Sequence, residues 1–249
     1  MGSLMHTTVK IVSILVFLTC SKILADTNFQ PANTAAEVAP VQTRTSFVEN
    51  RGQHDAKVKY YLSGAHGSVF FTAKEVVFSF CRKEEKRHPK KPVKTTEKDD
   101  EKPVARLVFR FKFDGADPQP IIIGQKELPG KINYLVRSRK DWKTNIPVFE
   151  EVLYSNIYEG IDVVFSAPGN NLKYTIILGK GADIAKVRLA YGGVDGVCVN
   201  PEGELVISTS FGDFVDPPPK VFRKSNGKSA PVKVRIRIIE KDCVGFLEI

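Results

Sequence analysis

Hydrophobic and polar residues alternate along most of the chain from about residue 45 onward. The clearest run is residues 107–113, where Leu107, Phe109, Phe111 and Phe113 are separated by single residues, two of them basic. A second run, residues 232–238, has Val or Ile at every even position and Lys or Arg at every odd position. Successive side chains of a strand point to opposite faces. Both runs therefore predict strands with one buried and one solvated face.

Shorter runs of the same kind predict further strands. They lie at residues 58–63, 68–72, 76–80, 161–166, 172–178, 187–191, 205–208 and 244–249. Turn-forming residues separate them, including an Asn226-Gly227 pair that favours a tight hairpin. We find no window longer than about ten residues with helical periodicity. The pattern predicts an all-β fold of stacked antiparallel sheets, either one elaborate β-sandwich or two small ones divided near residues 129–147.

The N-terminus has the pattern of a signal peptide. Lys10 precedes an apolar run over residues 11–18, and Ala25 offers a small residue for cleavage. The run is too short to span a bilayer, which needs about 20 residues. We therefore expect a signal peptide over residues 1–25, a flexible linker over residues 26–44, and a secreted or cell-surface protein with no transmembrane span in the mature chain. The alternative for the apolar run is a buried strand or helix.

Charge is concentrated in one segment. The formal net charge is +9, or about +7 without Lys10 and Lys22 of the predicted signal peptide. Between Arg82 and Lys102 the residues are mostly charged, and such a stretch buries too little apolar surface to offset its ordering entropy. Residues 82–103 are thus predicted to be a disordered, solvated insertion. The alternative is a contact with a polyanion, although interleaved acidic residues weaken it and the lack of aromatic residues argues against nucleic acid.

Three cysteines follow the predicted signal peptide, namely Cys81, Cys198 and Cys243. At most one internal disulfide can form, and Cys198 with Cys243 is the pair we would test, since export permits oxidation. The alternative is three reduced, buried thiols. No C-x-x-C spacing occurs, so a structural zinc site is not expected, and no metal or other cofactor is predicted.

Common catalytic motifs are absent from the sequence: it has no Gly-rich phosphate loop, no H-E-x-x-H and no G-x-S-x-G. The one carboxylate pair that suggests acid and base chemistry is Glu159 and Asp162, as in a polysaccharide hydrolase. That hypothesis predicts both groups in one cleft, about 5–10 Å apart. Asp162 also alternates with Ile161 and Val163 at the start of a predicted strand, which favours a turn-capping or exposed role.

Several separated motifs follow one another in a characteristic order. They are residues 47–53 (Phe-Val-Glu-Asn-Arg-Gly-Gln), 58–61 (Val-Lys-Tyr-Tyr), 128–134, 142–147, 158–165 and 172–174. Together they resemble the N-terminal domain of unknown function of bacterial secreted and cell-surface proteins that continue into SBBP repeats of the β-propeller type. The resemblance covers Ser46 to Ile249, without the repeats. It implies an extracellular, β-rich module with no established activity and supplies no catalytic residue.

Aromatic and amide side chains within these motifs suggest a ligand site. An aromatic face stacks on pyranose rings while amides bond hydroxyls, so one hypothesis is a sugar-binding groove. Its members would be Trp142, Tyr134, Tyr158, Asn133 and Asn145. The alternative is structural, with Trp142 filling a core or seam and with Asn50, Asn133 and Asn145 bonding turn backbone. The leading function is therefore a non-catalytic module for adhesion or envelope scaffolding, with an extracellular glycan or surface protein as partner; the alternative is the hydrolase.

Overall fold

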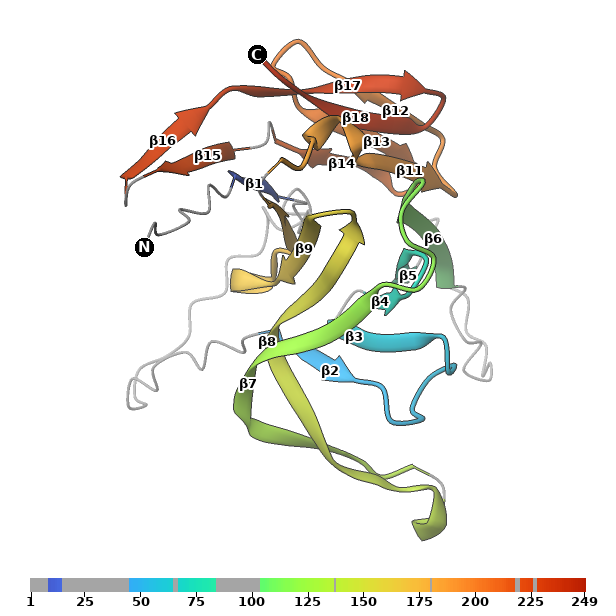
Figure 1. Ribbon diagram of the computed structural model, residues 1–249. Helices are drawn as coiled ribbons and strands as arrows, with labels where there is room; N and C mark the ends of the chain where they lie inside the picture. The colour runs from blue at the N-terminus through green and yellow to red at the C-terminus, as the bar shows by residue number, and fades with distance from the viewer. Residues whose placement is uncertain are drawn as a thin grey trace, which may run out of the picture.

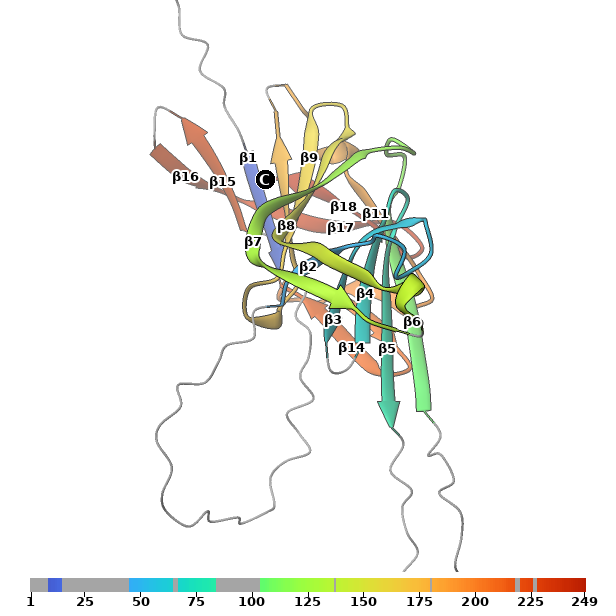
Figure 2. The ribbon, with the colours of Figure 1, turned by 90° about the horizontal axis from the view of Figure 1, so that it is seen from below.

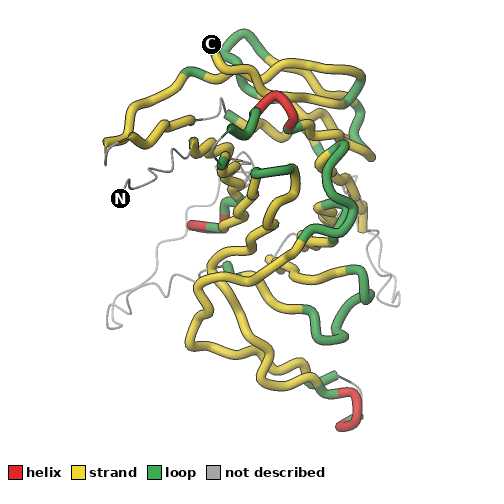
Figure 3. The backbone as a smooth tube through the Cα atoms, viewed as in Figure 1, coloured by secondary structure: helices red, strands yellow, loops and turns green. Residues whose placement is uncertain are grey.

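The computed structural model describes residues 9–14, 45–64, 67–83, 104–136, 138–179, 181–217, 220–225 and 228–249, and these residues are mostly in strands (Figure 1, Figure 3). The first nine strands are β1 (Val9–Ile14), β2 (Phe47–Glu49), β3 (Val58–Gly64), β4 (Gly67–Thr72), β5 (Val76–Lys83), β6 (Val104–Phe113), β7 (Ile121–Tyr134), β8 (Lys143–Tyr158) and β9 (Ile161–Ser166). The others are β10 (Lys173–Leu178), β11 (Arg188–Gly192), β12 (Gly196–Val199), β13 (Leu205–Thr209), β14 (Gly212–Asp216), β15 (Lys220–Ser225), β16 (Lys228–Val232), β17 (Val234–Glu240) and β18 (Cys243–Glu248). The described helices are three short 3-10 turns, η1 (Arg139–Asp141), η2 (Pro168–Asn170) and η3 (Ile184–Lys186).

The strands form two antiparallel sheets. The large sheet runs β16-β15-β1-β10-β9-β8-β2-β3-β4-β5-β6-β11-β18-β17, with β7 paired to β8 off this path. The small sheet is β12-β13-β14. The predicted all-β fold of antiparallel sheets is thus confirmed, and so is the tight hairpin predicted from the Asn226-Gly227 pair, since Ser225 of β15 pairs with Lys228 of β16.

The core shows how the large sheet folds over itself. Phe165 of β9 lies with its ring centre 5.1 Å from that of Phe71 on β4 and 6.2 Å from that of Phe111 on β6. Strands β8–β10 therefore face β4–β6, as the two layers of a sandwich do. The small sheet adds Phe214, whose ring centre lies 5.1 Å from that of Phe109.

Strand β6 bears out the alternation that predicted it, since its residues from Leu107 onward are alternately buried and exposed. The prediction for residues 232–238 was partly wrong. That run is divided between β16 and β17, and Ile238 is 45% exposed. The register against β18 shifts between Ile238 and Glu240, so a bulge at this outermost strand breaks the regular alternation.

Strand β8 joins two cores. It pairs with β7 along most of its length, with β9 from Glu151 onward and with β2 around Phe149. The second, smaller core consists of Val48, Tyr61, Ile146 and Val148, with Val58, Phe70, Leu128, Ile132 and Tyr134 packed against it. The predicted division near residues 129–147 falls inside this β7–β8 hairpin, and strands from both sides of it share one sheet.

Several predicted segments lie wholly or partly outside the described residues. Of the predicted signal peptide, residues 9–14 are described and form β1, between β10 and β15. The predicted linker is not described before residue 45. The charged insertion is described only at its beginning, up to Lys83, and β6 follows it at Val104. In the described part of the chain, no helix is long and apolar enough to cross a membrane.

Candidate functional site

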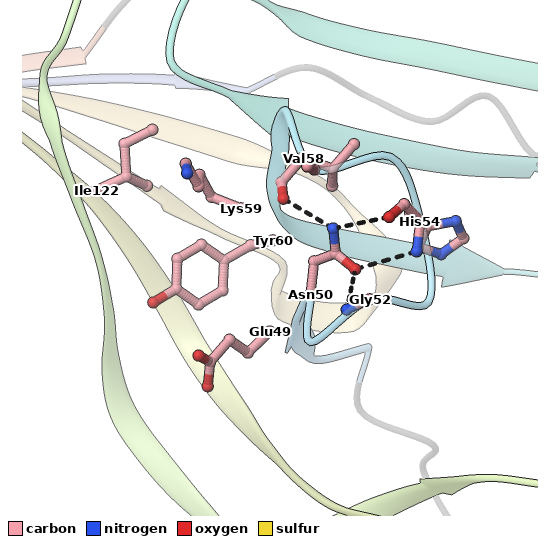
Figure 4. Close-up of a pocket in the computed structure, with 9 residues that line it drawn as sticks. Glu49, Asn50, Gly52, His54, Val58, Lys59, Tyr60 and Ile122 are labelled. Atoms are coloured by element: carbon pink, nitrogen blue, oxygen red, sulfur yellow. Dashed lines mark hydrogen bonds between the residues drawn. The ribbon is translucent and has the colours of Figure 1, made fainter. Parts of the chain in front are cut away.

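The loop between β2 and β3 is organised by one side chain, Asn50. Its amide nitrogen donates to the carbonyl oxygens of His54, Asp55 and Val58, at 3.3, 2.9 and 2.9 Å. Its amide oxygen accepts from the backbone nitrogens of Gly52 and His54, at 3.1 and 3.0 Å. Figure 4 shows this side chain at the centre of the loop. The predicted role of Asn50 in bonding turn backbone is confirmed, and the loop is held in one shape before any ligand arrives.

A hollow of about 480 Å³ lies between this loop and β7. Its walls come from the end of β2, the start of β3 and one residue of β7 (Figure 4). The lining residues are Glu49, Asn50, Gly52, His54, Ala56, Val58, Lys59, Tyr60 and Ile122. The hollow therefore combines the rings of Tyr60 and His54 and several aliphatic side chains with one carboxylate and one ammonium group.

Tyr60 is fixed in the wall of the hollow. Its phenolic oxygen accepts a hydrogen bond of 2.8 Å from the backbone nitrogen of Gly124, and its ring meets that of Phe149 edge-on, with centres 5.7 Å apart. Burial raises the pKa of the Tyr60 phenol, and the nearby Glu49 carboxylate raises it further, against the lowering effect of the Gly124 hydrogen bond. The phenol is thus protonated at neutral pH and can donate its proton to a ligand.

The charged groups of the hollow differ in their partners. The Glu49 carboxylate accepts from the Arg51 guanidinium, at 3.1 Å from Nη2 and 3.3 Å from Nε. Lys59 is exposed on β3. A bound molecule would thus meet an oriented carboxylate acceptor and a lysine donor, which are groups that bond hydroxyls well.

His54 closes the loop side of the hollow. Its ring meets Tyr61 and Phe70 edge-on, with ring centres 4.4 and 5.1 Å apart. Burial lowers the pKa of the imidazole. His54 is therefore neutral at physiological pH, and its packing fits a structural side chain that links the loop to the small core.

Four of the five predicted ligand residues lie at the outer end of the β7–β8 hairpin. Asn133 and Asn145 meet, because the Asn133 side-chain oxygen accepts from the Asn145 backbone nitrogen at 2.9 Å. Trp142 is 40% exposed at the end of the hairpin, and Tyr134 packs against the small core. None of the four lines the hollow.

Tyr158 lies elsewhere, at the inner end of β8. It is buried, and its hydroxyl is placed between the carbonyl oxygens of Asp114 and Arg188, at 2.9 and 3.1 Å. The hydroxyl can donate to one or the other. Tyr158 thus serves the main core and is not joined to the other four residues in a groove.

The two carboxylates of the hydrolase hypothesis have different surroundings. Asp162 accepts from the Asn156 backbone nitrogen at 2.6 Å and lies 3.4 Å from the Ser155 hydroxyl. Glu159 has a side chain that is 93% exposed and pairs with Lys186 at 3.7 Å. Neither carboxylate lines the hollow, and Asp162 stabilises the irregular end of β8, where the register shifts against β9.

The cysteines of the described residues are free thiols, Cys81 and Cys198 exposed and Cys243 buried. The predicted bond between Cys198 and Cys243 is not formed in this structure. Cys243 lies near the carboxylates of Asp114 and Glu240, with ligand atoms within 4.8 Å of one another. The Arg188 guanidinium pairs with both carboxylates, so the protein itself supplies the positive charge there.

The hollow was not singled out from the sequence. Glu49, Asn50, Lys59 and Tyr60 stood within the two motifs at residues 47–53 and 58–61, but the motifs gave no reason to join them to Ile122. The one local indication was the Asn-Arg-Gly sequence, typical of a turn. The contact between β3 and β7 spans 64 positions along the chain and follows only from the folded hairpin.

An all-β sandwich with a preformed polar hollow is the class of protein that these observations define. The chain belongs to the family described as a domain of unknown function, DUF7948, whose model matches residues 47–247. No curated protein and no solved structure matches the chain.

Proposed function

We propose that this chain is a secreted, non-catalytic β-sandwich module that binds a glycan at the cell surface, and that the hollow beside the Asn50 loop holds the sugar. The observation that carries the proposal is the preformed hollow itself. Its loop is fixed by five hydrogen bonds of the Asn50 side chain, three that it donates and two that it accepts. Secretion rests on the signal-peptide pattern of residues 1–25.

The chemistry of the lining suits a carbohydrate. Tyr60 and Ile122 offer apolar surface for the C–H face of a sugar ring, while Glu49 and Lys59 offer an acceptor and a donor for hydroxyls. A volume of about 480 Å³ is within the range of small-ligand sites. The polar groups are few, and Arg51 orients the Glu49 carboxylate, as expected of a site that binds its ligand in one orientation.

The test is a glycan array probed with the exported chain at physiological and at high salt. We expect binding to a defined sugar that persists at high salt, because hydroxyl contacts are screened less than ion pairs. Glu49→Gln and Lys59→Met should each weaken binding by about tenfold, the effect of losing one good polar contact. Lys57→Met is the matched control, since Lys57 is exposed in the same loop but does not line the hollow.

Two outcomes would overturn the assignment. One is binding to anionic glycans alone that disappears at high salt, which would point to the charged insertion between Arg82 and Lys102. The other is equal loss of binding in Lys59→Met and Lys57→Met, because the hollow would then have no special part in it.

A further inference from the structure

The described residues between β7 and β8, 135–136 and 138–142, form the arm end. They lie at the end of the β7–β8 hairpin that projects away from the other strands (Figure 1) and that faces the viewer when the molecule is seen from below (Figure 2). Leu135, Val136 and Trp142 are 55%, 42% and 40% exposed there. It is unusual for three large apolar side chains within eight residues to be exposed to solvent at a projecting end.

Two cationic residues belong to the same arm end, and one of them lies near the Trp142 ring. The Arg139 guanidinium lies 5.8 Å from the centre of the Trp142 ring, and Lys140 is the next residue of η1. The only acidic side chain of the arm end is Asp141, which already accepts a hydrogen bond of 2.7 Å from the Ser138 hydroxyl. The arm end thus presents apolar and positively charged groups together.

We propose that the arm end docks on an anionic lipid surface. Tryptophan prefers the boundary between headgroups and acyl chains, and adjacent arginine and lysine side chains meet lipid phosphates. Leu135 and Val136 would enter the same boundary layer. The charge of the arm end is complementary to such a surface, and a narrow projecting end suits a deformable layer better than a flat protein face.

The two strands that carry the arm end are held in place by contacts of their own. Asn133 and Asn145 bond across the hairpin, and Ile132 and Tyr134 pack on the small core. Docking therefore needs no folding of the hairpin. This surface shares no residue with the hollow, so the lipid proposal and the glycan proposal can fail separately.

Trp142 is the sole tryptophan of the chain, which allows a direct test. The exported chain is mixed with vesicles of phosphatidylcholine alone or with about one third phosphatidylglycerol, and both co-sedimentation and tryptophan emission are recorded. We expect binding to the anionic vesicles, with a shift of the emission to shorter wavelength as the indole leaves water. All variants are prepared as the same exported chain, so differences among them arise from the substitutions alone.

Variants separate the arm end from the rest of the surface. Leu135→Ser combined with Val136→Ser should weaken vesicle binding by about tenfold or more. Arg139→Gln with Lys140→Gln should do the same at low salt. Ile121→Ser is the matched control, since Ile121 is 65% exposed at the opposite end of β7.

The proposal is overturned by vesicle binding without any change in Trp142 emission, because another surface would then be in contact. Equal losses in the Ile121 control and the arm-end variants would also overturn it. Failure to bind vesicles, with retention instead by an acidic protein, would assign the arm end to a protein partner and overturn the lipid proposal.

Discussion

Tyr60 on β3 and Gly124 on β7 are joined by a hydrogen bond of 2.8 Å, which the Gly124 backbone nitrogen donates to the phenolic oxygen. Glycine is required at this position because a Cβ atom there would lie 2.6 Å from the ring of Phe149. The same Phe149 ring packs edge-on against Tyr60. One wall of the hollow is thus fixed by three residues from β3, β7 and β8.

Replacing Tyr60 by Phe tests this bond. Tyr60→Phe keeps the ring but leaves the Gly124 N–H without its partner, so we expect the free energy of unfolding to fall by about 1–3 kcal/mol. Urea denaturation measures the change. Tyr134→Phe is the control, because Tyr134 lies on β7, the strand that also carries Gly124. An equal loss of unfolding free energy in both variants would mean that the Gly124 bond contributes nothing of its own.

Two substitutions of Asn50 divide its hydrogen bonds. Asn50→Ala removes all five, and we expect a loss of about 2 kcal/mol or more in unfolding free energy. Asn50→Asp keeps the two bonds accepted from Gly52 and His54 but sets a carboxylate against three carbonyl oxygens. Both variants should be less stable. Amide hydrogen exchange should show Gly52 and His54 protected in Asn50→Asp and unprotected in Asn50→Ala; equal exchange in the two would contradict the bonding described.

His54 should make stability depend on pH. Burial lowers the pKa of its imidazole in the folded chain below the ordinary value of 6.5, so the unfolded chain takes up a proton first. Its contribution to stability is complete above pH 6.5 and is lost as the pH falls through the folded pKa. Denaturant titrations between about pH 7.5 and 5 should show a steeper decline for the natural chain than for His54→Asn. Parallel curves would exclude His54 as a source of the decline.

Thiol labelling tests the cysteine arrangement. Cys81 and Cys198 are exposed, so both should react quickly with a maleimide in the native protein. Cys243 is buried on β18 and should react only after denaturation. Mass spectrometry of the labelled peptides assigns each site. An unlabelled Cys198 that becomes reactive only after reduction would instead support the disulfide with Cys243 predicted from the sequence.

The alternation of residues predicted much of the fold because the sheets have one wet and one dry face. Leu107, Phe109 and Phe111 of β6 are buried as expected. The β7–β8 hairpin is not predicted by alternation, because Pro129 and Pro147 interrupt its strands in the region where the sequence suggests a division. In the structure, the register shifts between Glu127 and Lys131, so the pairing of the strands resumes beyond Pro129.

The candidate site was less accessible to sequence reasoning for a physical reason. Aromatic residues near one another in the motifs were expected to share a groove, but strand geometry separates them. Trp142 lies at one end of β8 and Tyr158 at the other, buried in the main core. Conversely, Tyr60 and Ile122 are far apart in sequence and line one hollow only because the Tyr60 side chain reaches β7, where its hydroxyl bonds Gly124.

The continuity of β8 through both cores has a mechanical consequence. A protein anchored by the arm end would receive tension along the axis of β8, from Lys143 inward to Tyr158. That strand is hydrogen-bonded to β7 and, in its inner half, also to β9. Pulling along it loads many ladder bonds in parallel, whereas pulling across a sheet opens them one after another. The hairpin thus transmits force directly to the centre of the large sheet, and the resistance of the fold to forced unfolding is set by the rate at which β8 is torn from its neighbours.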